Sequence, residues 1–324
     1  MSKRTLPKSV KIVAFSLLII TLLTVITLYL RTLHIDMLNP AGIIALKERN
    51  LMLFALALGA VVIIPVFIMT ILIALRYREG NTKAAYKPDW ATNHAAEAVW
   101  WGIPIILITI LSIVTWNSTH SLDPYKPLPD HDKSLTIQVV SLDWKWLFIY
   151  PEQGIATVNF VQFPTDTSVK FQLTSDTVMN SFWIPKLSGQ LYAMPGMLTN
   201  LHLNATEFGD FKGSAANITG EGFAGMKFTA RASSQADFDA WVRKAKESPN
   251  VLSHKNYAKL TEKSENNPVS YYGSVASDLH ESIIMKYMMP SDTAVDGKHH
   301  EDMDSGTMDH GSMNHSKMKD METN

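Results

Sequence analysis

Histidine and methionine side chains are interleaved close to the C-terminus, where they form a set of potential metal ligands. The histidines are His299, His300, His310 and His315, and the methionines are Met303, Met308, Met313 and Met318. Imidazole and thioether groups both suit copper, so this segment could bind the metal loosely. Its charged composition, poor in bulky apolar residues, also fits plain solvated disorder. We expect residues 291–324 to form a disordered tail, with copper binding as the alternative role.

Other kinds of chemistry find little support among the residue types. The chain of 324 residues contains no cysteine, which excludes disulfides, thiolate metal sites, thiol nucleophiles and lipid attachment through a cysteine. A Gly-x-Ser-x-Gly nucleophile elbow is absent as well. The formal net charge of −1 gives no basis for nucleic-acid binding, which normally leaves a basic excess on one domain. The function therefore has to be sought in the elements of the chain and in what they position.

Three apolar blocks before Asn117 have the length of membrane helices. They cover residues 12–30, 51–75 and 98–116. About nineteen residues at roughly 1.5 Å each nearly cross a hydrocarbon core about 30 Å thick. Tryptophans, which are enriched at membrane interfaces, stand near both ends of the third block at positions Trp100, Trp101 and Trp116. The sequence predicts a transmembrane hairpin within residues 31–120.

Basic residues in the short flanks predict the orientation of these helices, because cytoplasmic flanks carry the excess of lysine and arginine. Such residues precede the first block and fill the loop between the second and third: Lys3, Arg4, Lys8, Lys11, Arg76, Arg78, Lys83 and Lys87. Both flanks should be cytoplasmic. Residues 31–50 and everything after Asn117 should then lie in the periplasm of a bacterium, with the hairpin in the inner membrane.

The first apolar block, within residues 1–30, has two possible interpretations. A basic start followed by an apolar core describes a cleaved signal peptide as well as a membrane anchor. Its apolar run is longer than the roughly 7–15 residues of a signal-peptide core, and no Ala-x-Ala site follows it. We favour an extra anchor, with cleavage left open.

From Leu135 the pattern changes to short β-branched and aromatic runs separated by Gly, Pro, Asn and Asp, which is typical of an antiparallel sandwich. The predicted strands are residues 135–140, 144–150, 156–161, 168–174, 198–203 and 226–232. Their spacing fits a Greek-key β-sandwich of roughly a hundred residues. We expect a periplasmic domain over residues 121–248.

A helix is predicted after the last strand. Ser234 and Asp237 have the spacing of a capping box, and an apolar stripe of Phe238, Trp241, Val242 and Ala245 follows at helical intervals. The stripe should dock on the sandwich or on a partner. Residues 249–290 are mixed in pattern, with a second amphipathic stretch at 277–289. We expect them to form an extension on a larger surface rather than a separate domain.

The segment SLDWKWLFIYPEQGIATVNFVQFP, residues 141–164, resembles subunit II of the haem–copper terminal oxidases, and most closely its bo-type ubiquinol oxidase branch. The resemblance extends over residues 39–289. It implies an α+β membrane protein in which a helical hairpin is followed by a cupredoxin-like Greek-key domain on the periplasmic face. Hydropathy and strand pattern predict the same arrangement independently.

In the cytochrome c-oxidising branch of this family, the cupredoxin-like domain holds a dinuclear copper centre. Two cysteines, two histidines, a methionine and one backbone carbonyl bind it. The vestigial positions in this sequence fall in loops within residues 178–197 and 215–228; they are Asn180, Ala215, Asn217, Thr219, Phe223 and Met226. Only the methionine matches a side-chain ligand. A lone thioether beside alanine, threonine and phenylalanine cannot bind copper with useful affinity, so we expect no metal or other cofactor in this chain.

The missing ligands imply an electron donor other than cytochrome c. By resemblance, ubiquinol binds in subunit I, and the haems and copper that reduce dioxygen lie there too. This chain would be a structural and assembly subunit of a proton-pumping respiratory oxidase, with subunit I, the small subunits III and IV and membrane lipids as partners. By resemblance, the aromatic patch that corresponds to Trp144 and Trp146 receives electrons in the cytochrome c branch. In this sequence the expected role of both tryptophans is packing.

Glu97 has both a structural and a functional interpretation. It stands at the cytoplasmic start of the third apolar block, where an acidic side chain favours the helix dipole. The family resemblance implies instead that a glutamate here lies at the entrance of a proton channel in subunit I. The sequence leaves both open.

Two alternatives to the ubiquinol oxidase hypothesis remain. Within the family, a menaquinol-oxidising subunit II of the aa3 type also lacks the copper ligands. In a different class, a membrane-anchored copper-delivery protein would use the Met/His tail to carry metal.

Overall fold

The computed structural model describes residues 35–81, 84, 92–128 and 134–288, together with single positions between Leu17 and Tyr29. The Met/His tail at 291–324 and most of the first apolar block lie outside these residues. The predictions made for both segments therefore stay predictions.

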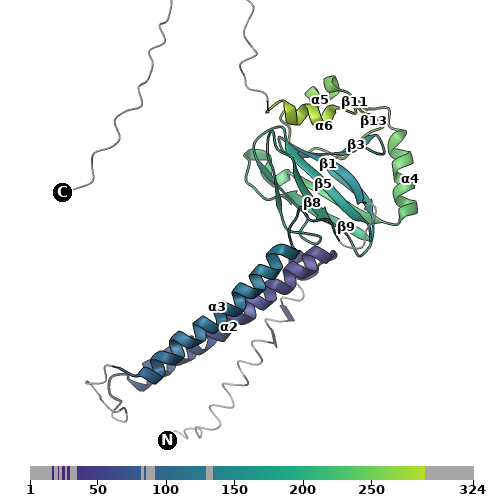
Figure 1. The fold of residues 1–324 in the computed structure, drawn as a ribbon. Helices are drawn as coiled ribbons and strands as arrows, with labels where there is room; N and C mark the ends of the chain where they lie inside the picture. Colours follow the sequence, from purple (N-terminus) through teal and green to yellow (C-terminus); the bar gives the residue numbers. More distant parts are fainter. Residues whose placement is uncertain are drawn as a thin grey trace, which may run out of the picture. The chain divides into compact units, whose positions relative to one another are not determined.

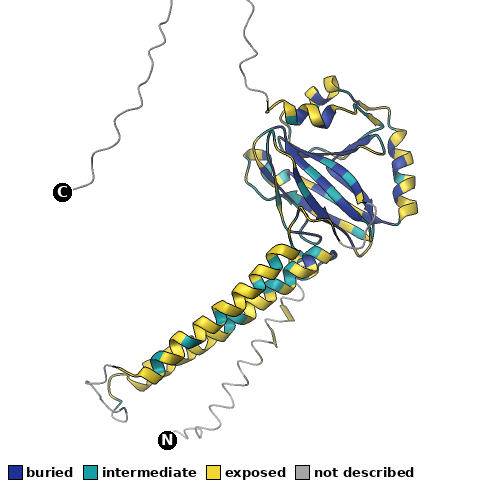
Figure 2. Ribbon diagram, viewed as in Figure 1, coloured by how far each residue is buried: buried dark blue, intermediate teal, exposed yellow. Residues whose placement is uncertain are grey.

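Two long helices form the hairpin. They are α2 (Ile43–Arg76) and α3 (His94–Ser121), which lie side by side in Figure 1, and both are longer than the apolar blocks from which they were predicted. Within the described residues, these two helices are long and apolar enough to cross a membrane. Their surfaces are mostly exposed along the whole hairpin (Figure 2). Apolar side chains on all faces are what a helix needs to contact lipid on one side and another helix on the other.

The water-exposed part is built on two mixed β-sheets. In spatial order, the six-stranded sheet contains β12, β3, β2, β1, β5 and β8, and the five-stranded sheet contains β4, β10, β9, β6 and β7. The strands of the first sheet are β12 (Ser270–Tyr272), β3 (Ile155–Val158), β2 (Lys145–Tyr150), β1 (Ser134–Leu142), β5 (Ser168–Ser175) and β8 (Thr199–Leu203). Those of the second are β4 (Phe160–Pro164), β10 (Lys227–Ser233), β9 (Gly209–Ala215), β6 (Asn180–Trp183) and β7 (Leu191–Ala193).

The sheets differ from the prediction at one predicted strand. Residues 156–161 form two strands in different sheets, β3 and β4, because the chain turns at Asn159. Asn159 has a φ of 56°, a left-handed conformation that asparagine tolerates better than most residues. The sandwich is also not purely antiparallel, since β1 pairs in parallel with β5, and β10 in parallel with β4.

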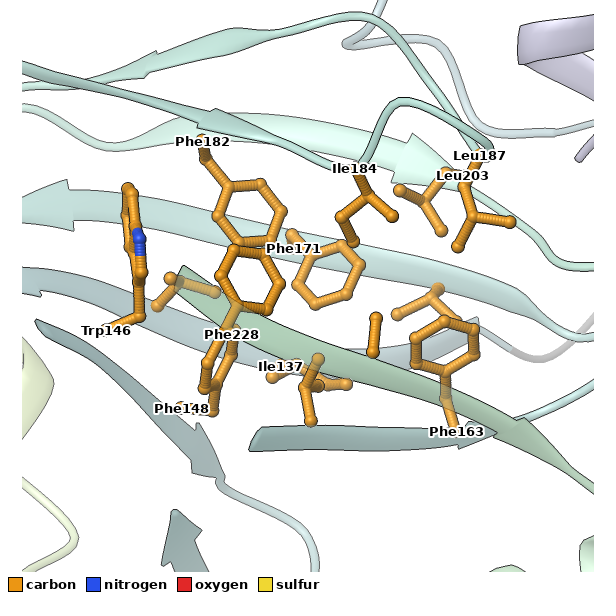
Figure 3. Close-up of a cluster of buried hydrophobic side chains, with 14 of the residues drawn as sticks. Ile137, Trp146, Phe148, Phe163, Phe171, Phe182, Ile184, Leu187, Leu203 and Phe228 are labelled. Carbon is orange, nitrogen blue, oxygen red and sulfur yellow. The ribbon is translucent and has the colours of Figure 1, made fainter. Parts of the chain in front are cut away.

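The main core lies between the two sheets and is dominated by aromatic rings (Figure 3). Phe182 and Phe228 stack with centroids 5.0 Å apart, and Trp146 meets Phe182 edge-on at 5.3 Å. Trp146 itself has no exposed surface. Such ring pairs add stability beyond their buried area.

The residue pair that leads into α2 reaches this core through Ala41. Ala41 is 3% exposed and its N–H donates to the carbonyl of Lys186, while the N–H of Ile43 donates to the Asn204 side chain. Gly42 permits the approach, because a Cβ there would lie 2.6 Å from the carbonyl oxygen of Asn204. The beginning of α2 and the sandwich must therefore lie on the same side of any membrane that the hairpin spans.

The predicted helix after the sandwich is confirmed as α4 (Gln235–Lys246). The Ser234 side chain accepts a hydrogen bond from the N–H of Asp237, as the capping box predicts. Phe238, Val242 and Ala245 are buried, and Trp241 packs against the same core. The apolar stripe docks on the sandwich of this chain.

The extension after α4 contains β11 (Val251–Leu252), α5 (His254–Leu260), β12, β13 (Ser274–Val275) and α6 (Leu279–Met285). It contributes β12 to the six-stranded sheet and covers the outer face of that sheet with a second core. Leu252, Tyr257, Leu279 and Ile283 pack there against sheet residues such as Leu147. The extension is therefore an integral layer of the domain.

Candidate functional site

Three segments of the chain bring the predicted vestigial copper positions together beside the stacked rings of Phe182 and Phe228. Strand β6 supplies Asn180, the end of β9 supplies Ala215, and the following loop with the 3-10 helix η2 (Glu221–Gly225) supplies Thr219 and Phe223. Backbone hydrogen bonds join the segments: Ala216 N–H donates to the Ser181 carbonyl at 3.0 Å, and Ala215 N–H to the Met226 carbonyl at 3.2 Å.

Asn180 and Met226 are in direct contact at the centre of this site. The amide Nδ2 of Asn180 donates to the sulfur of Met226 at 3.1 Å, and the Asn180 Oδ1 accepts from the Ser181 N–H at 2.8 Å. The two residues are 2% and 1% exposed. A hydrogen bond thus joins two of the positions that the sequence analysis predicts to be vestigial copper ligands.

The remaining predicted positions have structural partners. Asn217 accepts a hydrogen bond from the Ser181 hydroxyl at 3.1 Å, and Phe223 packs on the edge of the main core. The carbonyl of Thr219 accepts from the Trp144 indole N–H at 3.3 Å. The Thr219 hydroxyl is buried without a hydrogen-bond partner within the described residues. All six positions lie in one cluster, which serves packing and loop closure.

Trp144 and Trp146 have different environments. Trp146 lies inside the core, whereas Trp144 is partly buried over the loop of η2. Gly222 makes room for the Trp144 ring, because a Cβ at this glycine would lie 2.4 Å from a ring carbon. Trp144 has a φ of 60°, which is costly for a bulky residue. Both tryptophans have packing contacts, as the sequence predicts.

The residue types at this site do not suit a copper centre. Copper centres need thiolate or imidazole donors, and the cluster offers an amide, a hydroxyl and one thioether. Across the described parts of the chain there is no group of three or more His, Cys, Asp or Glu side chains placed to hold a metal ion. The donor set of this cluster therefore does not fit a copper centre that accepts electrons.

Glu97 lies in the first turn of α3, away from this cluster. Asn93 caps the helix by accepting hydrogen bonds from the N–H groups of Ala95 and Ala96. A carboxylate oxygen of Glu97 lies 3.1 Å from Nδ1 of His94. The side chain of Glu97 remains partly exposed, so a proton could reach it from water.

Sequence reasoning missed a polar cluster just before Asn180. Asp176 is buried, and its carboxylate accepts hydrogen bonds from Tyr257 at 2.7 Å and from Lys286 at 2.8 Å. Burial, with the Asp176 carboxylate as a second cause, raises the pKa of the Tyr257 hydroxyl well above its usual value. The cluster ties α5 and the end of α6 to the loop that leads into β6 and Asn180. No local pattern around Asp176 indicated this role.

A second missed residue is Lys145, between the two tryptophans. Its side chain is buried and donates to the Glu262 carbonyl at 2.7 Å and to the Ser264 hydroxyl. Burial lowers the pKa of Lys145, against the opposing influence of Asp143 and Glu262. Lys145 thus fixes the extension at a second point.

Family models match both parts of the water-exposed domain. Residues 151–233 match the model described as cytochrome c oxidase subunit II, periplasmic domain, and residues 246–291 match the COX aromatic rich motif. The fold and these matches define the class as the cupredoxin-like second subunits of terminal oxidases. A domain of this class with two candidate membrane helices fits a membrane-anchored protein.

Curated relatives identify the family. Cytochrome bo(3) ubiquinol oxidase subunit 2 of Pseudomonas aeruginosa is 52% identical over 81% of this chain and 80% of the relative. Ubiquinol oxidase subunit 2 of Acetobacter aceti is 45% identical over 78% of this chain and 83% of the relative. Quinol oxidase subunit 2 of Bacillus subtilis is 35% identical over 75% of this chain and 77% of the relative. The chain belongs to the family of ubiquinol oxidase subunit 2.

Proposed function

We propose that this chain is subunit II of a proton-pumping respiratory oxidase that transfers electrons from ubiquinol to dioxygen. The Asn180–Met226 contact carries the proposal, because it joins two positions at which the family resemblance implies copper ligands in the cytochrome c-oxidising branch. Without thiolate or imidazole donors there, cytochrome c has no electron acceptor in this chain. A membrane quinol can instead deliver electrons directly to the partner subunit.

The ubiquinol branch is favoured over the menaquinol branch by sequence identity. The relatives named for ubiquinol are 45% and 52% identical, against 35% for the quinol oxidase subunit of Bacillus subtilis. The copper-delivery alternative has no support from a described metal-ligand group, and its tail lies outside the described residues.

In this proposal the chain assembles and covers subunit I, which holds the haems and copper and binds ubiquinol. The complex lies in the bacterial inner membrane, with this domain in the periplasm and the small subunits III and IV beside subunit I. The domain offers an apolar surface, the rim of the Asn180 cluster, which consists of Val178, Met179, Tyr192, Met197, Leu198 and Ile218. Exposed apolar groups gathered on neighbouring loops indicate a protein partner.

The test is to isolate the complex through a tag on this chain and to measure its haem spectrum and oxygen uptake. We expect the preparation to contain haem and to take up oxygen rapidly with ubiquinol. We expect no oxygen uptake with reduced cytochrome c. Faster uptake with menaquinol would assign the chain to the other quinol branch. Activity with cytochrome c, or a haem-free preparation, would contradict the proposal.

We propose further that Glu97 stands at the entrance of a proton channel in subunit I. Its place at the cytoplasmic start of α3 and its partial exposure support this role. Glu97→Gln should lower ubiquinol oxidation and proton pumping, because a neutral amide cannot relay protons. His94→Gln, which alters only the neighbouring ring, is the matched control. Equal activity of Glu97→Gln and the unmodified complex would leave Glu97 with a structural role alone.

A further inference from the structure

A cavity lies where α4 meets β4, β10 and β12. Its volume is about 510 Å³, within the range of roughly 300–1,000 Å³ that small-molecule sites occupy. The lining residues are Phe160, Arg231, Trp241, Lys244, Ala245, Ser248, Asn250, Val269, Ser270 and Tyr271. None of them belongs to the Asn180 cluster or to its rim.

Three aromatic rings form the apolar part of this cavity. The Phe160 ring lies 5.9 Å from the Trp241 ring and 6.1 Å from the Tyr271 ring, each centroid to centroid. Trp241 also meets Tyr150 edge-on at 5.4 Å, which holds it against the sandwich. Rings supported in this way offer faces on which a flat apolar molecule can pack.

The charges at the cavity favour an anion. The Arg231 guanidinium lies 5.4 Å from the Phe160 ring centroid. It donates two hydrogen bonds to the Asp210 carboxylate, at 2.6 and 2.7 Å. Lys244, in contrast, has no ion pair with a carboxylate in the described parts of the chain. Counting Arg231 and Lys244 against Asp210 leaves one uncompensated positive charge.

We propose that this cavity binds a small organic anion with a single charge and a flat apolar body, of the class of aromatic carboxylates. The rings of Phe160, Trp241 and Tyr271 would contact the flat body. The Lys244 ammonium would pair with the carboxylate, and the amide of Asn250 and the hydroxyl of Ser248 would offer further polar contacts.

The place of the cavity gives binding a structural consequence. Phe160 and Arg231 belong to the segment that matches the subunit II periplasmic domain, and Ser248, Asn250 and Tyr271 belong to the aromatic rich motif. A ligand that contacts both segments stabilises the state in which they are joined. Occupancy should therefore protect the extension from proteolysis.

The experiment uses the detergent-purified complex with the full chain and equilibrium dialysis of 2-naphthoate. A dialysis cell with detergent micelles alone corrects for partitioning. 2-Naphthalenemethanol is the neutral analogue of the probe. Lys244→Glu reverses the unpaired charge, and Val269→Trp fills the cavity from its rim. The matched control is Lys246→Glu, because Lys246 stands in the same last turn of α4 but does not line the cavity.

We expect the complex to bind 2-naphthoate saturably. Lys244→Glu should weaken this binding about tenfold or more, because it removes a close charge pair. Val269→Trp should weaken it by a similar factor, because the new side chain takes up contact area in the cavity. Lys246→Glu should bind as the unmodified complex does, and the neutral analogue should bind much more weakly. The proposal is overturned by uptake that does not exceed the micelle control, by equal loss in Lys246→Glu, or by equal binding of the neutral analogue.

Discussion

At the scale of single residues, Trp144 shows how the loop of η2 is held. Its left-handed backbone costs energy, and the structure offsets that cost with a hydrogen bond to Thr219 and with contact to Gly220 and Gly222. The three glycines at 220, 222 and 225 have the spacing of a dinucleotide-binding motif. Here they follow β9 into a short 3-10 helix, where Gly220 and Gly222 make room for the Trp144 ring and Gly225 makes room for the Asn266 side chain.

Gly222→Ala should displace the Trp144 ring. The new methyl group would lie 2.4 Å from a ring carbon, and overpacking of this kind costs about 1–3 kcal/mol in the free energy of unfolding. Thermal unfolding of the purified complex and near-ultraviolet circular dichroism would report the change. Gly102→Ala is the control, since no atom lies within 4 Å of its Cβ position. An unchanged melting temperature for Gly222→Ala would contradict the packing role of Gly222.

His280 on α6 should make stability depend on pH. It is 5% exposed, its Nε2 has no hydrogen-bond partner among the described residues, and burial lowers its pKa from 6.5 to about 4. Between these values the unfolded chain binds a proton that the folded chain does not. The free energy of unfolding should therefore fall as the pH is lowered from about 6.5 to about 4, by at most on the order of 3 kcal/mol.

Melting temperatures measured across this pH range would test the contribution of His280. His280→Gln, which does not titrate, should flatten the dependence. His254→Gln is the control, because His254 is exposed and lies 3.1 Å from the Asp278 carboxylate. The same pH profile in His280→Gln and in the unmodified complex would assign the dependence to other groups.

At the scale of elements, the extension depends on polar contacts as well as on its second core. Asp176→Ala would leave the Tyr257 hydroxyl and the Lys286 ammonium without their acceptor. Removing one partner from buried hydrogen bonds costs about 1–3 kcal/mol, and the exposure of Lys286 favours the lower end. Limited proteolysis should then cut the extension between α5 and α6 faster. The control is Asp278→Ala, which removes only the exposed pair with His254. The protease should cut this variant at the same rate as the unmodified chain.

The elements also show what the sequence could predict. α4 was predictable because its capping box and apolar stripe are local signals, and both are seen. The division of residues 156–161 into two strands at Asn159 could not be predicted, because both halves carry strand-forming residues and groups far away in the sequence stabilise the turn. The Asn159 side chain accepts from the Trp146 N–H and donates to the Asn267 carbonyl. The second core was missed because its residues are scattered over short elements without a long periodic run.

The candidate site also has a part that the sequence could predict and a part that it could not. The cluster of Asn180, Ala215 and Met226 was predictable through the family resemblance, since its motifs are continuous in the sequence. Asp176, Lys145 and the cavity beside Lys244 depend on contacts between segments far apart in the chain. Lys145 and Ser264, for example, are 119 residues apart. Burial of such polar groups becomes visible only when the extension is folded on the sheet.

At the scale of the whole molecule, the rim of the Asn180 cluster should determine assembly. Ile218 is 85% exposed and Met179 is 45% exposed, so a charge at either position costs the isolated chain little. If the rim contacts subunit I, Ile218→Asp together with Met179→Asp should reduce the haem that copurifies with the tagged chain. Val251→Asp is the control, because Val251 is exposed on the extension instead. Undiminished haem in the double variant would assign the contact to another surface.

The start of α2 links membrane insertion to the folding of the sandwich. Ile43 and its partner Asn204 are 161 residues apart, and Thr206 bonds back to Ala41 over 165 residues. During synthesis the ribosome makes residues 41–45 first, and they must wait for these partners. A chain in which only one of the two helices crossed the membrane would leave residues 41–45 and the sandwich in opposite compartments, and the core would lack Ala41. Insertion of both helices is thus a condition of complete folding, so a chain with only one helix inserted would present a defective domain to cellular proteases.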